Sequence, residues 1–392
     1  MKVWLSLALG AAVVVYAYYN IQQGLEPWAP KLMNMCFSPA NTDTEGDLRV
    51  AYTGLSNTLD RYLCFLVNFY KQPLHDVVGA PLLRLMMAAF GTAYALMTFE
   101  ASRRGFRKTL LMAFPLFGLL SHVFGIYAVF TLFWVPLDLY YQHGKTKIDY
   151  QIKAYEAYGI LIALLLGYMV PSAIMTSPLI GEDTKAEQNF ICLWFVLPLL
   201  LVPLVSVCQT LYKRGGSYVD RIKNREVKER LYIAEGKDAV ERSYITLGII
   251  NMFLYFGSCW WITQQGIYLW DAIVLLLKAP GTLPADLTYG ELGQLLTTRT
   301  LLIEYIVLAV GFILWATFNS GMLIGLAVAL GTPFVGPAAA VSFYAYWREN
   351  HIQNLTSSNR AEAAALQQAI NKAEEAMSKR QETVSKKSKK IN

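Results

Sequence analysis

The sequence predicts an all-α fold: a polytopic transmembrane helical bundle of about 8 crossings (range 7–10) with a polar C-terminal tail. Of its 392 residues, 55% are apolar and only 16% are charged, whereas soluble domains carry about 25% charged residues. The charges gather in short blocks, and the apolar runs between them reach the roughly 20 residues that a membrane-crossing helix needs. Backbone groups in lipid must satisfy their own hydrogen bonds, so such runs predict helices. No segment alternates over about ten residues as barrel strands do.

The apolar runs give the expected crossings in chain order. The run at 3–19 is not followed by a small-x-small cleavage site, so it predicts a retained first helix rather than a signal peptide. The short amphipathic stretch 59–70 suits a helix that lies at the membrane interface. Further crossings are expected at 77–99, 110–139, 155–175, 190–211, 244–277, 301–318 and 322–346, the last two joined by a tight Asn319-Ser320-Gly321 turn.

Two of these runs are too long for one simple crossing. Pro115 and Pro136 interrupt 110–139, which is therefore either one long tilted helix or two short broken ones. The run 244–277 is ambiguous in the same way. Eight crossings place both termini in the cytosol but send the basic loop 213–242 to the lumen. Splitting both long runs gives ten crossings and returns that loop to the cytosol, but we favour eight.

The loops carry the orientation signal. The segment 213–242 holds nine Lys/Arg against six Asp/Glu, and the positive-inside rule places it in the cytosol. The basic block 103–108 belongs there for the same reason. The loop 177–189 is acidic, as expected of a lumenal loop.

Two domains are expected, a transmembrane helical domain at 1–347 and a solvated basic C-terminal tail at 348–392. Lys389 and Lys390 stand third and fourth from the C-terminus, which is the dilysine address read by the cytosolic retrieval coat. The address predicts a multi-pass protein of the endoplasmic reticulum membrane with a cytosolic C-terminus and the coat as a partner. The sequon at Asn354 conflicts with this, because it would be glycosylated only in the lumen; we follow the tail chemistry.

The five cysteines, Cys36, Cys64, Cys192, Cys208 and Cys259, show no CxxC spacing. We interpret them as small buried hydrophobes rather than as a disulfide or a metal site. The net charge of +6 comes mainly from the loops and the tail. Because no basic stripe is interleaved with aromatics, membrane lipid is an expected partner and nucleic acid is not.

Motifs of soluble enzymes are absent from the sequence: it holds no P-loop, GxSxG, HExxH or Rossmann fingerprint. Its 4 histidines are too few for a multi-histidine di-iron site. There is no DDxxD motif, so the paired carboxylates that hold magnesium on a diphosphate are missing, which argues against a prenyltransferase or an ionising terpene synthase. We therefore expect no cofactor and no metal.

Ionisable residues in or beside apolar helices are costly to bury, so each is a functional candidate. Glu100 and Arg103 can simply pair on one helical turn, and a lone mid-run histidine such as His122 is more often a hydrogen-bonded core residue. A buried carboxyl can keep its proton near neutral pH and serve as a general acid. The full set is Asp76, Arg84, Glu100, Arg103, His122, Asp138, Asp271 and Glu304.

The stretch 99–139, FEASRRGFRKTLLMAFPLFGLLSHVFGIYAVFTLFWVPLDL, resembles the E-S-x-R-x-G-N…P…G…Q…G-x-G…P-L-Y pattern of fungal membrane-bound terpene cyclases of the ascofuranone and ascochlorin type. The segment 167–171 (GYMVP) resembles that family's G-Y-x-x-P, and 194–209 resembles its following W…P…Q helix. The resemblance covers about 86–212, and the rest agrees only in hydropathy.

The resemblance implies an enzyme of fungal secondary metabolism that protonates a terminal epoxide or alkene on the prenyl chain of a meroterpenoid precursor. Ring closure then proceeds through a carbocation without a metal. Glu100 and Arg103 match the Glu and Arg of the motif. The departures leave the exact substrate open. They are Ala101, Phe106, His122 and Asp138, where the family has Ser, Asn, Gln and Tyr.

The leading hypothesis is therefore a metal-independent, integral-membrane terpene cyclase of the isomerase or lyase type with a hydrophobic prenylated substrate. A membrane transporter or lipid-handling protein is the alternative, because mid-helix charges and proline-broken helices also suit a permeation path. A third reading is an assembly factor of the endoplasmic reticulum. Aromatic rings can face the developing cation. The residues expected at the site are Glu100, Asp138 and Glu304 as proton donors, His122 as base or hydrogen-bond donor, and Arg103, Trp134, Trp260 and Trp261 as substrate-binding groups.

Overall fold

A computed structural model describes residues 1–37, 49, 51–177, 184–214, 224–279, 281, 286–352 and 368. Within these residues every regular element is helical, which confirms the predicted all-α fold. Six helices are long and apolar enough to cross a membrane, which makes the chain a polytopic membrane protein by length and composition. They are α1 (Lys2–Leu25), α4 (Gly79–Ser102), the continuous Ala154–Met175 segment, α10 (Thr184–Arg214), α11 (Arg225–Gln264) and α13 (Tyr289–Ser320).

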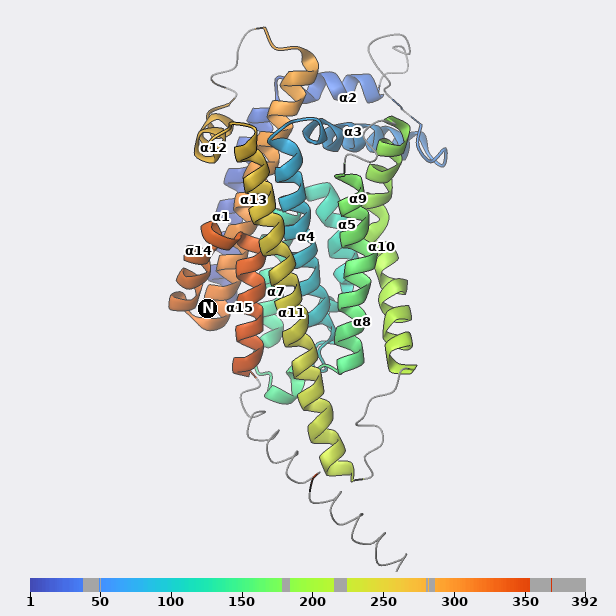
Figure 1. The fold of residues 1–392 in the computed structure, drawn as a ribbon, viewed down its shortest axis with the longest axis vertical. Coiled ribbons are helices and arrows are strands. Elements are labelled where there is room, and N and C mark those ends of the chain that lie inside the picture. The colour runs from blue at the N-terminus through green and yellow to red at the C-terminus, as the bar shows by residue number, and fades with distance from the viewer. Residues whose placement is uncertain are drawn as a thin grey trace, which may run out of the picture.

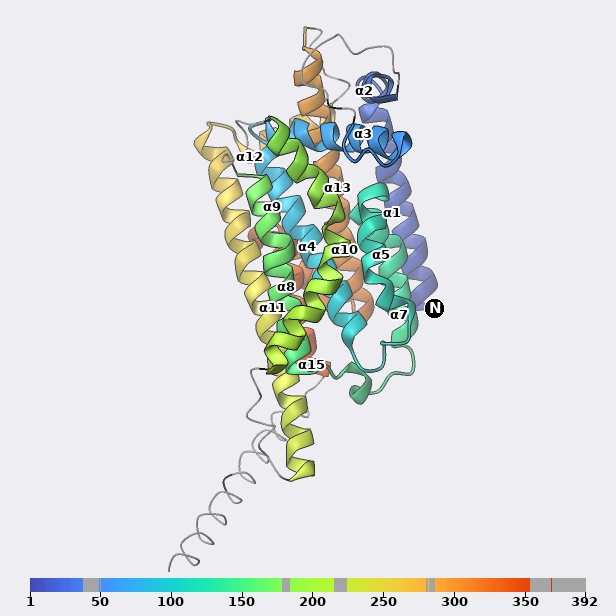
Figure 2. The same ribbon diagram turned by 90° about the vertical axis from the view of Figure 1, so that its right-hand side faces the viewer.

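The long run 110–139 folds as two short helical segments that turn at Gly125 (Figure 2). Gly125 has a φ of +82°, in the left-handed region that glycine adopts without strain. A Cβ there would meet the Tyr127 ring at 2.3 Å. Of the two alternatives left open for this run, the structure has the two short segments, whereas the favoured count of eight had treated the run as a single crossing. The outgoing segment is η1 (Leu110–Ala113) and α5 (Phe114–Phe124), and the returning one is α6 (Ile126–Ala128), η2 (Val129–Trp134) and α7 (Val135–Gln142).

The last apolar run, 322–346, was expected to cross once, and that expectation is wrong. α14 (Met322–Val335) has 14 residues, about 21 Å, which is shorter than the hydrocarbon core. α15 (Pro337–Ile352) turns back from Gly336, where φ is +83°. A Cβ on Gly336 would lie 2.7 Å from the Tyr255 ring, so a larger residue does not fit.

One end of the bundle is covered by helices that lie across it (Figures 1 and 2). They are α2 (Ala29–Phe37) and α3 (Asn57–Leu74), with α12 (Leu269–Lys278) beside them. α3 contains the stretch 59–70 that was predicted to lie at the interface, and its orientation agrees with that prediction. The run 244–277 contains the second half of the long helix α11 and, after a break, most of the short helix α12.

A disulfide between Cys36 and Cys64 ties α2 to α3, with the two Cα atoms 5.8 Å apart. The interpretation of all five cysteines as unpaired hydrophobes is wrong for these two. Their spacing in the sequence carries no signal, and only the fold brings them together. Cys192, Cys208 and Cys259 are free, as expected.

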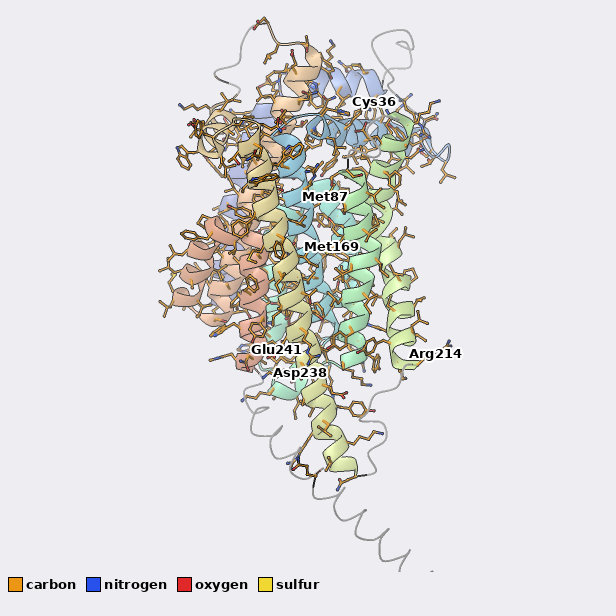
Figure 3. All side chains as sticks on the ribbon, viewed as in Figure 1. Cys36, Met87, Met169, Arg214, Asp238 and Glu241 are labelled. Carbon is orange, nitrogen blue, oxygen red and sulfur yellow. A yellow bond between two sulfur atoms is a disulfide. The ribbon has the colours of Figure 1, made fainter. Side chains whose placement is uncertain are left out.

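The opposite end of the bundle gathers the basic segments. Figure 3 shows Arg214 and Asp238 near that end and Cys36 at the other. Because the pair of short segments from α5 to α7 leaves and returns on the same side, the end of α10 and the start of α11 share this end with the block 103–108. The two short segments together add no crossing of the bundle. This removes the conflict between the number of crossings and the cytosolic side expected for the basic loop.

α4 is the central helix of the bundle. Of its most apolar stretch, 94% is buried, and α11, α13, α8 and α15 pack around it. Small residues allow this close packing; a Cβ on Gly91, for example, would lie 2.8 Å from the Tyr168 ring. Position along α4 therefore measures depth in the bundle.

The expected start of the solvated tail at 348 is wrong for its first two residues. α15 continues to Ile352, and Arg348 and Glu349 are only 4% and 0% exposed. Both side chains join ion pairs with α4 and its end. Lys389, Lys390 and Asn354 lie outside the described residues.

Candidate active site

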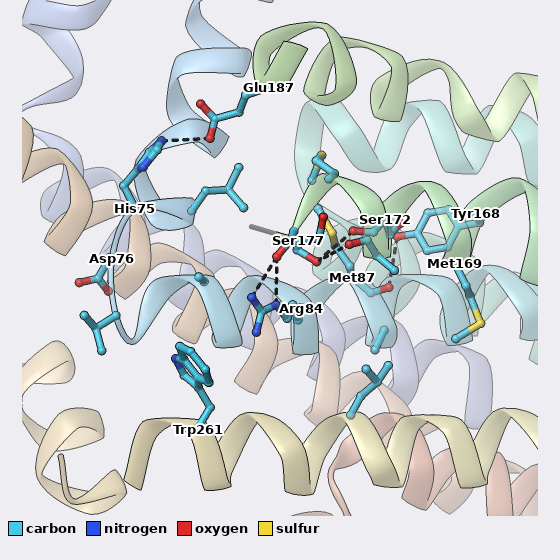
Figure 4. Close-up of a pocket in the computed structure, with 18 of the residues that line it drawn as sticks. His75, Asp76, Arg84, Met87, Tyr168, Met169, Ser172, Ser177, Glu187 and Trp261 are labelled. Atoms are coloured by element: carbon cyan, nitrogen blue, oxygen red, sulfur yellow. Dashed lines mark hydrogen bonds and ion pairs between the residues drawn. The ribbon is translucent and has the colours of Figure 1, made fainter. Parts of the chain in front are cut away.

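A cavity of about 760 Å³ lies between α4, α9 (Val170–Met175) and α11, close to the end that α2 and α3 cover (Figure 4). Charged and polar groups gather toward one end of it and apolar groups toward the other. Along α4 it extends from Val77 to Ala88, about 16 Å. The side chains used below are His75, Asp76, Arg84, Met87, Tyr168, Met169, Ser172, Glu187, Leu254 and Trp261.

The turn between α3 and α4 shapes the polar end of the cavity. Asp76 Oδ2 accepts hydrogen bonds from the Gly79 amide and from the Thr298 hydroxyl. These bonds fix the turn against α13. A Cβ on Gly79 would lie 2.4 Å from Thr298 Oγ1, so glycine permits this close approach. His75, at the end of α3, is thereby held at the mouth of the cavity.

His75 and Glu187 form an ion pair at this mouth. His75 Nε2 lies 3.0 Å from Glu187 Oε1, and the side chains are 42% and 5% exposed. Glu187 belongs to the first turn of α10, where the helix dipole favours a carboxylate. A carboxylate that accepts from one imidazole nitrogen orients the ring and leaves the other nitrogen for proton transfer.

The inner wall is aromatic and apolar. Tyr168 donates its hydroxyl to the Met87 carbonyl at 3.2 Å, and its ring stacks on Phe90 with centroids 5.6 Å apart. Trp194 Nε1 donates to Ser172 Oγ at 3.2 Å. Tyr168 lies in the π-helical turn η4 (Leu165–Met169), and such turns redirect side chains in otherwise regular helices.

Arg84 is a half-buried guanidinium in the middle of the cavity. Its Nε and Nη2 donate to the Thr176 carbonyl at 3.3 and 2.9 Å. No carboxylate among the described residues forms an ion pair with it. The cavity therefore holds a cation that no described carboxylate neutralises.

Only one of the residues predicted for the site lines this cavity. Trp261 does so, whereas its neighbour Trp260 is 64% exposed and is not part of the lining. Consecutive helical residues point about 100° apart, which explains why the two tryptophans differ. The other predicted residues lie elsewhere in the bundle.

Glu100 and Arg103 lie in an internal ion-pair cluster with Arg348 and Glu349. Glu100 accepts from Arg103 Nε at 2.9 Å and from Arg348 Nη1 at 2.7 Å, and Arg103 Nη2 donates to Glu349 at 2.6 Å. Guanidinium groups carry only donors, so the Glu100 oxygens act here as acceptors. Glu100 is about 24 Å from Arg84 along α4.

Asp138 lies near this cluster and is fully buried. Its Oδ2 accepts from Trp315 Nε1 at 2.9 Å and from Gln142 Nε2 at 2.6 Å. Trp134 is also fully buried, with its ring centroid 6.0 Å from that of Trp315. Asp138 Oδ1 and Trp134 Nε1 have no hydrogen-bond partner in the part of the chain that the structure describes. The structure thus brings Glu100, Arg103, Asp138 and Trp134 into one region, away from the cavity.

His122 and Glu304 lie neither in the cavity lining nor in the ion-pair cluster around Glu100 and Arg103. The His122 ring is surrounded by Phe90, Trp194 and Phe195, with centroids 5.1, 4.4 and 5.1 Å away. Neither ring nitrogen has a partner among the described residues, so His122 is not the hydrogen-bonded core residue that was the plainer expectation. Glu304 Oε1 lies against Gly125, at 3.1 Å from where a Cβ would be, on the far side of α4 from the cavity lining.

Sequence reasoning missed both partners of the pair at the mouth. His75 stands at a helix end and Glu187 in a loop interpreted only for its acidity, and no periodicity or spacing links them. Arg84 and Asp76 were recognised as candidates, because a charge at the edge of an apolar run is visible in the sequence. No group of three or more His, Cys, Asp or Glu side chains in the described parts of the chain is arranged to hold a metal ion.

The fold is that of a polytopic α-helical membrane protein, and a cavity lies between its helices. The CtvD domain model matches residues 1–259, and the chain belongs to that family. The matched part contains His75, Arg84 and Glu187 but not Trp261, Arg348 or the helices α12 to α15. No curated protein and no solved structure matches the chain.

Proposed function

We propose that the protein is an integral-membrane cyclase that protonates a terminal epoxide or alkene on the prenyl chain of a meroterpenoid precursor and closes rings by carbocation chemistry. The observation that carries this proposal is the cavity itself. At about 760 Å³ it falls within the range of small-molecule sites, roughly 300–1,000 Å³. It combines apolar walls for a prenyl chain with an imidazole–carboxylate pair for proton transfer.

The chemistry follows from the pair at the mouth. Protonated His75, paired with Glu187, donates a proton to the epoxide oxygen. The carbon–oxygen bond breaks, the oxygen becomes a hydroxyl, and an alkene of the same chain supplies the electron pair for the new carbon–carbon bond. The resulting cation loses a proton to neutral His75 or is captured by an oxygen of the substrate. Proton transfer by a positioned group contributes typically 10²–10⁴-fold.

The apolar walls serve the same reaction. A carbocation exposed to water is captured as an alcohol before it forms a ring, and a closed apolar site prevents that side reaction. The rings of Tyr168 and Trp261 border the cavity, and aromatic faces attract a positive charge. This division between a polar mouth and an apolar interior suits a substrate that arrives from the membrane.

The earlier donor candidates remain predictions, and the geometry favours the cavity pair over them. Glu100 is occupied by two guanidinium groups. Asp138 keeps Oδ1 free of hydrogen bonds within the described residues, but neither Asp138 nor Glu304 borders the cavity. We propose that Glu100 and Arg103 hold α4 against α15. Substitutions of these residues can be compared in the microsomal assay of cyclised product described below.

We also propose the endoplasmic reticulum as the location, with the basic end in the cytosol and the α2–α3 end in the lumen. Two observations support this orientation. Basic loops favour the cytosol, and the disulfide Cys36–Cys64 belongs in an oxidising compartment. The basic segments and the disulfide lie at opposite ends of the bundle, so a single orientation places the first in the cytosol and the second in the lumen.

The direct experiment is expression in yeast microsomes with epoxidised prenyl-aromatic substrates. The wild type is expected to give a cyclised isomer of unchanged mass. Glu187→Gln and His75→Gln are expected to lose it while remaining folded. Glu26→Gln, an exposed acid near the same end, is the matched control. Absence of product from folded wild-type protein, or full activity of Glu187→Gln, would contradict the proposal.

A transporter is the second candidate, and the two pairs of short helices favour it. Segments broken at Gly125 and Gly336 resemble the discontinuous helices that line transport paths. Proteoliposome flux separates the two functions, because a cyclase changes its substrate without moving a solute across the bilayer.

A further inference from the structure

Arg84 lies in the cavity, and none of the described carboxylates pairs with it. Of its five N–H groups, those on Nε and Nη2 donate to the Thr176 carbonyl. That oxygen caps the C-terminus of α9, and a helix C-terminus offers only about half an elementary negative charge. Part of the guanidinium charge therefore remains uncompensated by the described residues.

The two carboxylates on the cavity lining are engaged with other groups. Glu187 pairs with His75, and Asp76 caps Gly79 and accepts from Thr298. Both lie at the mouth, whereas Arg84 lies about 7.5 Å along α4 from its first residue, Gly79. Because no described carboxylate neutralises Arg84, a molecule in the cavity can supply the anion.

Ser172 supplies a second donor on the opposite wall. Its oxygen accepts from Trp194 Nε1 at 3.2 Å, which holds the hydroxyl, itself a donor, on the cavity wall. Ser172 is one helical turn before Thr176 and is 7% exposed. Arg84 and Ser172 thus present N–H and O–H donors to the same cavity.

We propose that Arg84 and Ser172 bind an acidic oxygen on the head group of the substrate, such as a carboxylate, phenolate or enolate. This inference rests on the proposed function. The aromatic or polyketide head lies at the apolar end against Met87, Tyr168 and Met169. The end of the prenyl chain then lies toward His75 and Glu187 at the mouth. Guanidinium groups suit this role because they bind carboxylates through two parallel hydrogen bonds.

Ligand binding to the full-length protein in detergent tests the assignment without any turnover. The probes are a farnesylated hydroxybenzoate, its methyl ester and oleate, compared by calorimetry at pH 7.5. The wild type is expected to bind the acid about tenfold more tightly than the ester. Arg84→Gln is expected to remove that preference, Arg84→Lys to keep part of it, and Ser172→Ala to reduce it. Arg104→Gln, an exposed arginine at the other end, is expected to change nothing.

Two outcomes would overturn the inference: equal binding of acid and ester by the wild type, or an unchanged preference in folded Arg84→Gln. Oleate separates a substrate site from a general lipid site, and binding of oleate as tight as that of the prenylated acid would overturn the substrate assignment. Glu187→Gln keeps this test distinct from the cyclase proposal. It is expected to retain the preference for the acid even though it forms no product.

Discussion

The imidazole of His75 lies 3.0 Å from the carboxylate of Glu187, across the mouth of the cavity. The first residue ends α3 and the second begins α10, and the turn held by Asp76 brings them together. The pair gives a proton donor a fixed place beside an apolar space.

Loss of Glu187 should affect chemistry more than binding. Glu187→Gln is expected to lower kcat about 10²–10⁴-fold, because the imidazolium of His75 loses the anion that stabilises it. KM should change little. Microsomal assays with Asp138→Asn as the comparison decide between the cavity pair and the internal acid. Loss of kcat in Asp138→Asn alone would favour Asp138.

The internal cluster should matter for stability. Glu349→Gln leaves Arg103 with one carboxylate fewer in a fully buried position, and breaking a buried pair costs about 3–5 kcal/mol. Unfolding in detergent is expected to show a loss of that size, while Glu26→Gln changes nothing. Glu100→Gln should behave in the same way. If it folds normally and yet makes no product, Glu100 is catalytic after all.

The disulfide between Cys36 and Cys64 should stabilise the end of the bundle that positions α3. Cys36→Ser is expected to lower the free energy of unfolding by about 2–4 kcal/mol. Reducing agent should produce the same loss in the wild type and none in the variant. Cys259→Ser, which removes a free cysteine, is the control and should leave stability unchanged.

Asp60 should give the protein an acid-sensitive contact in the first turn of α3. The Thr53 hydroxyl, together with the Thr53 and Gly54 amides, hydrogen-bonds this carboxylate and lowers its pKa. A group with a lowered folded-state pKa stabilises above its unfolded pKa, near 3.9, and loses that contribution as pH falls through the folded-state value. Unfolding measured from pH 6 down to pH 3 is expected to show a smaller slope in Asp60→Asn. Equal slopes in the two proteins would contradict this.

The dilysine address should determine location without affecting chemistry. Replacing Lys389 and Lys390 with alanine is expected to move the protein out of the endoplasmic reticulum, because a coat receptor reads the pair as an address. Product formation in isolated membranes should persist. Fluorescence microscopy and the microsomal assay measure the two effects separately.

Several features could be predicted from local sequence because they depend on local composition. The run lengths predicted helices, and Pro115 and Pro136 marked 110–139 as a run that could be broken. Trp261 lines the cavity, but the sequence could not distinguish it from Trp260, because it does not show which face of α11 meets the cavity. The return at Gly336 was missed, because 322–346 has the length and hydropathy of a single crossing.

Hydropathy and charge blocks were sufficient to establish a helical membrane protein with basic segments at one end, because lipid imposes those requirements on every stretch of chain separately. The sites depended on the fold. The pairs Cys36–Cys64, Glu100–Arg348 and His75–Glu187 each join residues from different helices or helix ends, and no local pattern records which helices will pack together. The cavity around Arg84 exists only because α11 and α9 pack on α4 without filling the space between them.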